Sequence, residues 1–382
     1  MIKHVPLALY VHIPWCERKC PYCDFNSHEN FNPSLEQPYV EALLNDLDQQ
    51  ITWAASRELV SIFFGGGTPS LFSGGAIQQI LEGISQRLRL TNNCEITLES
   101  NPGSAEAMKF RSYRESGINR LSIGVQSFKE QHLSRLGRIH SGKEAIKAIA
   151  LARSAGFDRL NIDLMYGLPD QTIGDGLEDI ATGLEHGIDH LSWYQLTLER
   201  NTAFWSAPPL LPTEEVIEPM QQRATELLSG AGIEQYEVSA WSASGQRSVH
   251  NLNYWQFGDY LAIGAGAHGK VTDDDGVYRF QRTRHPRHYL EQFAKPASEP
   301  LSTQLRMVDQ RELPAEFMMN ALRLKHGVDS RFFEARTGLG SQTISAQLAE
   351  LRRRELIEPD AARLAATKAG YRYLDTLIES FI

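Results

Sequence analysis

Short apolar runs alternate with amphipathic segments through the first half of the chain. Runs rich in β-branched and aromatic residues predict six strands, at Leu7–Ile13, Val60–Phe64, Glu95–Leu98, Arg120–Gly124, Leu160–Met165 and Leu191–Leu196. Helical periodicity lies between them, as in Tyr39–Ala54 and Ala76–Leu88. Alternating strands and helices predict parallel strands with helical crossovers. Six such units fall short of a closed eight-stranded barrel, so we expect an α/β fold, an open partial (β/α)6 TIM-like barrel.

The second half of the chain follows a different pattern. A helix predicted at 214–231 precedes strand and turn material rich in Gly, Tyr and Trp. From about residue 310 the pattern is helical again, and a short hairpin near Leu356 makes this end winged-helix-like. We therefore expect a barrel over residues 1–207, a flanking and capping segment over 208–305, and a C-terminal helical winged-helix-like domain over 306–382.

Composition and charge narrow the possible functions. The 382 residues are 42% hydrophobic and 22% charged, which is ordinary for a globular protein. The net charge of -9 argues against nucleic-acid binding, and Arg352–Arg354 lie in a domain of balanced charge that favours docking. The N-terminus lacks a signal-peptide cleavage site, and no apolar run is long enough to span a membrane. These features predict a cytoplasmic protein.

Three cysteines near the start carry the strongest chemical signal. Cys16, Cys20 and Cys23 have spacings of three and two residues, which suit three corners of a [4Fe-4S] cubane. A fourth cysteine, needed for a closed electron-transfer cluster, does not follow at that distance. The fourth iron would therefore be open to a small ligand such as the amino and carboxylate groups of S-adenosylmethionine (SAM).

Other uses of these thiols are less favoured. Zinc completed by His12 or His28 is an alternative, although structural zinc sites usually add a second, distant cysteine pair. A disulfide would leave one thiol unpaired, and nothing indicates secretion. The remaining cysteine, Cys94, is interpreted as a small buried apolar residue.

Polar residues follow several predicted strands, where parallel barrels place their chemistry. After the second strand, Gly66, Gly67 and Thr68 form a turn that would let the SAM amino group approach closely. Glu99 follows the third strand and suits the SAM ribose or ammonium. Further strand ends contribute three more candidates: Gln126, Arg138 and Asp163.

Two later motifs need separate interpretation. Gly264–Gly269 matches the dinucleotide fingerprint GxGxxG, but the residues after it read as strand and turn, whereas the fingerprint requires a helix. In the second motif, His250-Asn-Leu-Asn-Tyr254-Trp255, an imidazole beside flat aromatic surface suits a heme. An ordinary packed aromatic cluster is the alternative. His268 is a weaker candidate for a heme ligand.

The motifs together resemble a known family. Tyr10-Val-His-Ile-Pro-Trp-Cys-x3-Cys-x2-Cys, Gly-Gly-Gly-Thr-Pro, Gly-Val-Gln-Ser-Phe and Ile-Asp-Leu-Met-Tyr-Gly-Leu-Pro are similar to the radical SAM proteins related to oxygen-independent coproporphyrinogen III oxidase. The resemblance covers nearly the whole chain. The His-Asn-Leu-Asn-Tyr-Trp run and the length are similar to the heme chaperone branch of that family.

The resemblance implies roles for individual residues. Cys16, Cys20 and Cys23 would hold a [4Fe-4S] cluster with exchangeable SAM. The residues implied to line the SAM region are Tyr10, Gly66, Gly67, Thr68, Glu99, Gln126, Arg138 and Asp163. In the oxidase branch the last three, with positions matching Tyr22 and Thr197, serve a second SAM. Two features depart from the oxidase, namely Phe25 in place of a fourth cysteine and only nine residues before Tyr10. The chaperone branch shares both departures.

Two hypotheses therefore compete. The leading one is a heme chaperone that binds heme at His250, with Tyr254 and Trp255 around the macrocycle, and passes it to an acceptor protein of unknown identity. Its expected partners include no nucleic acid, transient contact with membrane-bound acceptors, and a second copy in a homodimer. The alternative is a radical SAM enzyme that oxidatively decarboxylates the propionates of coproporphyrinogen, with the cofactor supplying the chemistry.

Overall fold

Six parallel strands form the centre of one large sheet. The computed structural model describes residues 5–295 and 305–382. The central strands are β1 (Leu7–Ile13), β2 (Leu59–Gly66), β3 (Leu90–Ser100), β4 (Arg120–Gln126), β5 (Arg159–Tyr166) and β6 (His190–Gln195). Each pairs in parallel with the next, which confirms the predicted crossovers. Almost every residue of β1 is buried, as expected for a strand covered on both faces.

Additional strands extend this sheet at both edges. Beyond β6 lie β8 (Ala240–Ser242) and β7 (Glu234–Glu237), both antiparallel. Beyond β1 lies β9 (Asp259–Ile263), which is parallel to β1. Three short antiparallel strands complete this edge: β10 (His268–Thr272), β11 (Val277–Gln281) and β12 (Arg306–Met307). The predicted flanking segment thus contributes strands to the barrel sheet itself, and its residues 296–304 lie outside the described residues.

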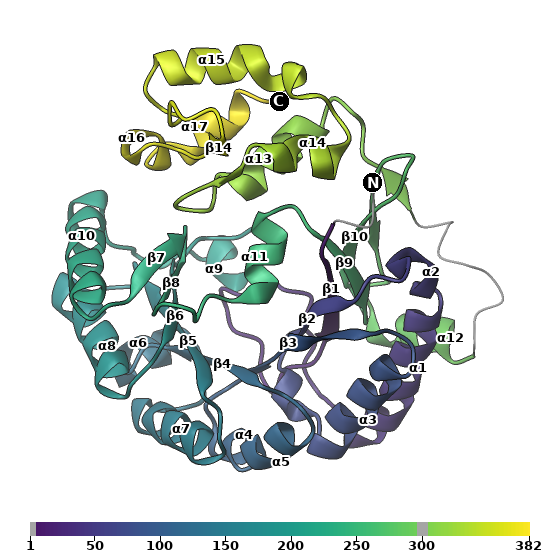
Figure 1. Ribbon diagram of the computed structural model, residues 1–382. Helices are drawn as coiled ribbons and strands as arrows, with labels where there is room; N and C mark the ends of the chain where they lie inside the picture. The colour runs from purple at the N-terminus through teal and green to yellow at the C-terminus, as the bar shows by residue number, and fades with distance from the viewer. Residues whose placement is uncertain (1–4, 296–304) are drawn as a thin grey trace.

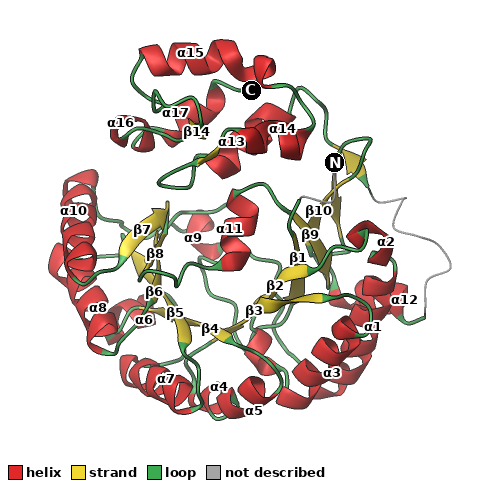
Figure 2. Cartoon of the chain, viewed as in Figure 1, coloured by secondary structure: helices red, strands yellow, loops and turns green. Residues whose placement is uncertain are grey.

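The sheet curves into an open crescent with helices on its convex side (Figure 1, Figure 2). Among the described residues it does not close, because its strand order ends at β12 and β7. This confirms the predicted open partial barrel. The helices up to the second domain are α1 (Glu36–Asp48), α2 (Ile51–Ala54), α3 (Gly74–Ser85), α4 (Ser104–Ala107), α5 (Phe110–Glu115), α6 (Glu130–Arg135), α7 (Gly142–Ser154), α8 (Ile173–Glu185), α9 (Ala203–Ser206), α10 (Glu214–Gly230), α11 (Val249–Trp255) and α12 (Pro286–Phe293).

Local sequence explains where several helices begin and break. Ser141 and Thr172 form capping boxes at the starts of α7 and α8. The helix predicted over Tyr39–Ala54 is interrupted between α1 and α2. At the break, the side-chain amide of Gln50 donates to Ala262 O at 2.8 Å and accepts from Ala262 N at 3.2 Å. Gln50 thus hydrogen-bonds the backbone of β9.

The C-terminal region forms a second hydrophobic cluster beside the open side of the crescent (Figure 1). A two-stranded antiparallel sheet and five helices build it, in agreement with the predicted helical winged-helix-like domain. The elements are α13 (Leu313–Ala321), β13 (Val328–Asp329), α14 (Arg331–Thr337), α15 (Ser345–Arg353), β14 (Arg363–Leu364), α16 (Lys368–Tyr371) and α17 (Leu374–Glu379). None of the helices in the described part of the chain is long and apolar enough to cross a lipid bilayer.

The C-terminal domain contacts both edges of the barrel sheet. At one edge, Arg323 pairs with Glu237 at 3.1 Å, and at the other Arg279 pairs with Glu316 at 2.7 Å. Helix α11 lies inside the crescent, between the barrel strands and this domain (Figure 1). A helix in that position can contact the barrel interior with one face and the second domain with another.

Candidate functional site

The cysteine loop lies directly after β1. Cys16, Cys20 and Cys23 are free and half-buried, whereas Cys94 is buried as predicted. Burial raises the pKa of Cys16 and Cys23. A guanidinium nitrogen of Arg138 approaches Cys20 Sγ to 3.5 Å and places positive charge beside the loop. The loop therefore presents three thiols to one region, with a cation next to them.

The glycine turn after β2 packs against this loop. The amides of Gly67 and Thr68 donate to Ile13 O and Trp15 O at 2.8 and 2.7 Å. Gly66 has φ of +114°, and a side chain there would meet the His12 ring at 2.6 Å. The glycine turn thus supports the cysteine loop. Within this turn, Gly66 lines a cavity.

Polar residues at the next strand ends are partly or fully buried, and each is held by hydrogen bonds. Arg138 donates to Asn101 Oδ1 at 2.6 Å and to Gly124 O at 2.9 Å. Asp163 accepts from Asn161 at 2.8 Å. Gln126 accepts from Tyr194 at 2.7 Å and has φ of +68° at a bulge between β4 and β5. A bulge with a left-handed residue re-aims a side chain, as is frequent beside functional sites.

Of the two remaining predicted SAM residues, Tyr22 borders these strand-end residues near Arg138 and Tyr194, and Thr197 lies apart from them. Tyr22, on the cysteine loop, packs beside Phe204 with ring centroids 6.4 Å apart. Thr197 is exposed after β6, where its hydroxyl donates to Glu199 Oε1 at 3.0 Å.

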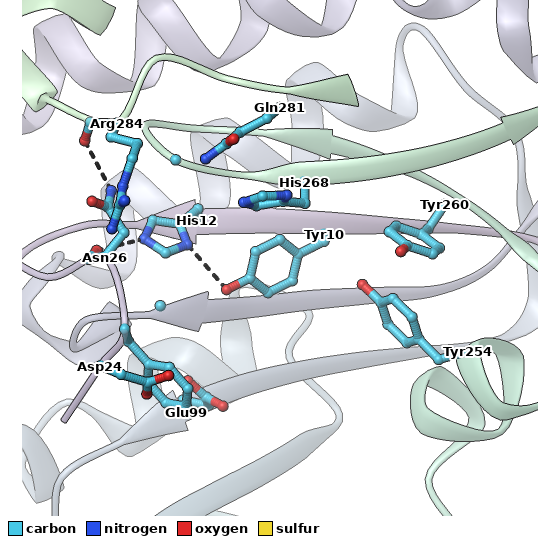
Figure 3. Close-up of a pocket in the computed structure, with 13 residues that line it drawn as sticks. Tyr10, His12, Asp24, Asn26, Glu99, Tyr254, Tyr260, His268, Gln281 and Arg284 are labelled. Atoms are coloured by element: carbon cyan, nitrogen blue, oxygen red, sulfur yellow. Dashed lines mark hydrogen bonds between the residues drawn. The ribbon is translucent and has the colours of Figure 1, made fainter. Parts of the chain in front are cut away.

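A cavity of about 570 Å³ opens between the cysteine loop, the ends of β1 and β2, and the strands β9 to β11. Its lining combines aromatic rings with imidazole, carboxylate and guanidinium groups (Figure 3). The lining residues are Tyr10, His12, Asp24, Phe25, Asn26, Gly66, Glu99, Tyr254, Tyr260, Gly266, His268, Gln281 and Arg284. This volume falls in the range of sites for cofactor-sized and drug-sized ligands, about 300 to 1,000 Å³.

Helix α11 carries the His250-to-Trp255 run, and its first turn is anchored inside the barrel. Glu95 accepts from the amides of Val249 and His250 at 3.1 and 3.0 Å and pairs with Arg159 at 2.7 Å. His250 is 3% exposed, and its Nδ1 lies 2.9 Å from Ser61 Oγ. Its ring stacks on Phe63, so the residue does not line the cavity.

The last two residues of α11 have different surroundings. Tyr254 lines the cavity, where its ring lies 4.2 Å from that of Tyr260 (Figure 3). Trp255 instead packs into the hydrophobic cluster of the C-terminal domain, with the Arg323 guanidinium 4.3 Å from its ring centre. The structure thus brings Tyr254, Tyr10, Gly66 and Glu99 to one cavity and leaves His250 and Trp255 outside it.

Comparison with known proteins places this geometry in a family. The Radical SAM superfamily model matches residues 10–182, and the HemN C-terminal domain model matches residues 308–373. The solved structure of coproporphyrinogen III oxidase (HemN) from Escherichia coli has a TM-score of 0.81 at 21% identity, over 99% of this chain and 90% of that one. That likeness establishes the fold alone.

Sequence relatives decide the family. Over the full length of both chains, this chain is 46% identical to the heme chaperone HemW of Escherichia coli. The chain belongs to the HemW family. It is also 44% identical to the heme chaperone HemW of Haemophilus influenzae, over all of this chain and 99% of that one. A mouse relative, radical S-adenosyl methionine domain-containing protein 1, mitochondrial, is 40% identical over 69% of this chain and 60% of its own.

Full-length similarity to HemW proteins matters for the cavity. The Radical SAM model ends at residue 182 and the HemN C-terminal model begins at residue 308. Between them lie α11, the strands β9 to β11 and the loop after β11, which supply Tyr254, Tyr260, His268 and Arg284 to the cavity wall. The matches to the HemW proteins of Escherichia coli and Haemophilus influenzae extend over this segment as well as over the cysteine loop.

The residues of this HemW-family chain fit a cluster and SAM, the groups that the superfamily implies. Among the described residues, no three His, Cys, Asp or Glu side chains are arranged around a single metal ion. Cubane thiolates each bind a different iron, so they need not converge on one point. Burial and the nearby Asp163 raise the pKa of Glu99 to about 8. A cationic ligand such as the sulfonium and ammonium of SAM would favour its ionised form.

Sequence reasoning missed much of the cavity wall of this HemW-family chain. Asn26 follows the cysteines, and His12 precedes them, but the sequence suggests His12 only as a zinc ligand. Tyr260 and Gln281 come from the strands that extend the sheet, and Arg284 follows β11. Their positions depend on the pairing of β9 with β1, and no local sequence pattern predicts that long-range pairing. His268 is the wall residue there that the sequence does single out, inside the glycine-rich run Gly264–Gly269, which leads into β10 as predicted.

Proposed function

We propose that this protein is a heme chaperone. It binds heme in the cavity beside the cysteine loop and transfers the heme to an acceptor protein. It also carries a [4Fe-4S] cluster on Cys16, Cys20 and Cys23, together with SAM. The observation that carries the proposal is the shared cavity, to which the predicted heme run contributes Tyr254 and the predicted SAM set contributes Tyr10, Gly66 and Glu99.

The chain's own residues would divide the work as follows. The cysteine thiolates would hold the cluster, and Arg138 would offset its negative charge. Glu99 and Asp163 would attract the cationic groups of SAM. When bound, the cluster and SAM supply redox chemistry, which we propose serves to gate heme uptake or release.

Aromatic rings support the heme part of the proposal. Tyr10, Tyr254 and Tyr260 give the cavity flat apolar walls that suit a macrocycle. Phe25, which stands in place of the oxidase's fourth cysteine, is 61% exposed and lies at the same cavity. The sequence also predicts heme contacts for His250 and Trp255. His250 is buried and Trp255 packs partly buried in the C-terminal cluster, both outside the cavity, so those contacts have less support than the contact of Tyr254.

A shared cavity has a thermodynamic consequence. A space of about 570 Å³ is typical of a site for one ligand of cofactor size. If heme and SAM both draw on it, each weakens the binding of the other by the same factor. Binding of SAM would then favour release of heme to the acceptor.

Partners follow from the proposed activity. The acceptor must be a heme protein, and the sequence does not name it. Transient contact with membrane-bound acceptors and a homodimer stay predictions. Sedimentation of the protein with and without heme would test the homodimer.

The proposal is tested by anaerobically reconstituted protein in two parallel assays. Loaded with one equivalent of heme, it should transfer that heme to an apo-heme protein, which is followed by the absorption of the acceptor. Incubated with coproporphyrinogen III, SAM and a reductant, it should form no vinyl product. Vinyl product at rates of many turnovers, without heme transfer, would replace the chaperone by the decarboxylase.

A further inference from the structure

Three histidines lie at or beside the cavity, and two of them are occupied. His12 uses both ring nitrogens, since Nε2 donates to Asn26 O at 2.9 Å and Nδ1 lies 3.1 Å from the Tyr10 hydroxyl (Figure 3). Burial lowers the pKa of His12 to about 4, so its ring is neutral. His12 is therefore committed to holding Tyr10 and the segment that follows Cys23.

His250 is enclosed by its neighbours and not fully hydrogen-bonded. Its Nδ1 bonds Ser61, and its ring is enclosed by Phe63 and Tyr254, with centroid distances of 4.8 and 4.9 Å. Its Nε2 is buried and has no hydrogen-bond partner in the described part of the chain. A heme iron could reach this nitrogen only if Tyr254 or Tyr10 moved aside.

His268 is the histidine that remains available. It opens β10, is exposed and lines the cavity, where its ring lies beside Tyr10 and Gln281 (Figure 3). Within residues 5–295 and 305–382, no hydrogen bond or ion pair engages its ring. Partial desolvation of its ring in the cavity, with Arg284 and Arg279 nearby, lowers the pKa of His268, which favours the neutral ring with a lone pair for a metal.

Arg284 gives the same cavity an anchor for carboxylates. Its guanidinium lines the wall, while its backbone carbonyl accepts from Asn26 at 2.8 Å. No ion pair engages this guanidinium within the described ranges. Arginine binds carboxylates through two parallel hydrogen bonds, so Arg284 suits a heme propionate.

The loop that leads to His268 is held firmly from behind. The amides of Gly264 and Ala265 donate to the hydroxyls of Tyr289 and Tyr39 at 3.0 and 2.8 Å. Gly266 has φ of +84°, and a side chain there would meet Asn26 at 2.3 Å. His268 then pairs with Gln281 in the β10–β11 ladder. A ligand residue on such a frame is positioned before heme arrives.

We propose that His268 is the iron ligand for heme bound in this cavity and that Arg284 holds a propionate of that heme. The proposal rests on the proposed function, since it assumes that heme is the cargo. It places the iron on the side of Tyr10 that faces β10. It also makes His250 a positioning residue, which acts through its contacts with Tyr254 and Phe63.

The test is an optical titration of the full-length, reconstituted protein with heme. His268→Ala should shift the Soret band and weaken heme binding by roughly tenfold or more, because even outer partners of metal ligands are worth ten- to a hundredfold. His268→Gly should regain the wild-type band when free imidazole is added. His326→Ala, at an exposed histidine of the C-terminal domain, is the matched control and should behave as wild type.

His250→Ala separates the two candidate ligands. It should keep the wild-type Soret position, whereas loss of that band in His250→Ala together with a wild-type band in His268→Ala overturns the proposal. Cluster absorption and thermal unfolding of each variant report whether it is folded. Failure of the wild-type protein to bind heme would instead overturn the proposed function, so the two failures are distinguishable.

Arg284→Ala tests the propionate contact. It should weaken heme binding severalfold and leave the Soret position unchanged. Heme dimethyl ester, which lacks the free carboxylates, should bind the wild type and Arg284→Ala equally. An equal loss for heme and its ester would contradict the assigned contact.

Discussion

Helix α11 and the loop before β10 both reach the cavity, and each is fixed from behind by one buried carboxylate. Glu95 accepts from the first amides of α11. Asp46 accepts from Gly264 N at 3.3 Å and from the Tyr289 hydroxyl at 2.7 Å. Helix α11 places the ring of Tyr254 in the cavity wall. The loop before β10 positions the imidazole of His268 in the same wall.

The two carboxylates differ electrostatically. Burial alone would raise the pKa of Glu95, but Arg120 and Arg159 hold it below its usual value. At Asp46, burial outweighs its partner Arg282 and raises the pKa. The helix is thus held by a firmly ionised group, and the loop by one that accepts a proton more readily. Although one buried carboxylate anchors each segment, the anchors of the helix and of the loop therefore respond differently to pH.

The sequence predicted the frame of the molecule well because the frame depends on periodicity. The six strands, their parallel order and the C-terminal helices follow from local apolar patterns. The cysteine spacing likewise singles out the loop after β1 as the proposed cluster site without any tertiary information. Direction was harder to predict, as the last two residues of α11 demonstrate. Tyr254 faces the cavity and Trp255 enters the C-terminal domain, since adjacent helical residues point about 100° apart.

The largest expected effect comes from removing the anchor of α11. Glu95→Ala would leave the guanidinium groups of Arg120 and Arg159 without their buried partner. Loss of one member of a buried ion pair typically costs about 3 to 5 kcal/mol. We expect a decrease of that size in the free energy of unfolding, measured by urea denaturation, together with weaker heme binding through displacement of Tyr254.

Asp46→Ala provides the counterpart on the loop. It should also destabilise the protein, but its heme complex should lose the wild-type Soret band, because His268 loses its support. Identical optical spectra for the two heme complexes would contradict the different roles of helix and loop.

Trp255→Ala should reduce stability and leave the ligand band intact. The ring is partly buried in the C-terminal cluster under Arg323, so truncation should cost about 2 kcal/mol. Calorimetric unfolding measures the loss, and the Soret position reports the heme. A shifted Soret band with unchanged stability would instead place Trp255 against the macrocycle.

Glu99→Gln should change the pH dependence of stability. The folded-state pKa of Glu99 is raised to about 8, so the unfolded chain releases its proton first as the pH rises. The wild type should therefore lose stability from about pH 4 up to about pH 8. Because the cavity admits water, the loss should be about 1 to 2 kcal/mol.

Glu99→Gln should remove most of that loss in the ligand-free protein and should also abolish stabilisation by SAM. Thermal unfolding at pH 5 and pH 8.5, with and without SAM, measures both effects. Gln78→Glu on the exposed face of α3 serves as a control for a simple charge change.

The most direct test of the shared cavity is a heme titration of the reconstituted protein with and without SAM. With SAM at about ten times its own dissociation constant, competition predicts roughly tenfold weaker heme binding, equivalent to about 1.4 kcal/mol. In Glu99→Gln, the same SAM concentration should have little effect. Saturable heme binding that is unchanged by bound SAM would contradict the account, because the two ligands would then occupy separate sites.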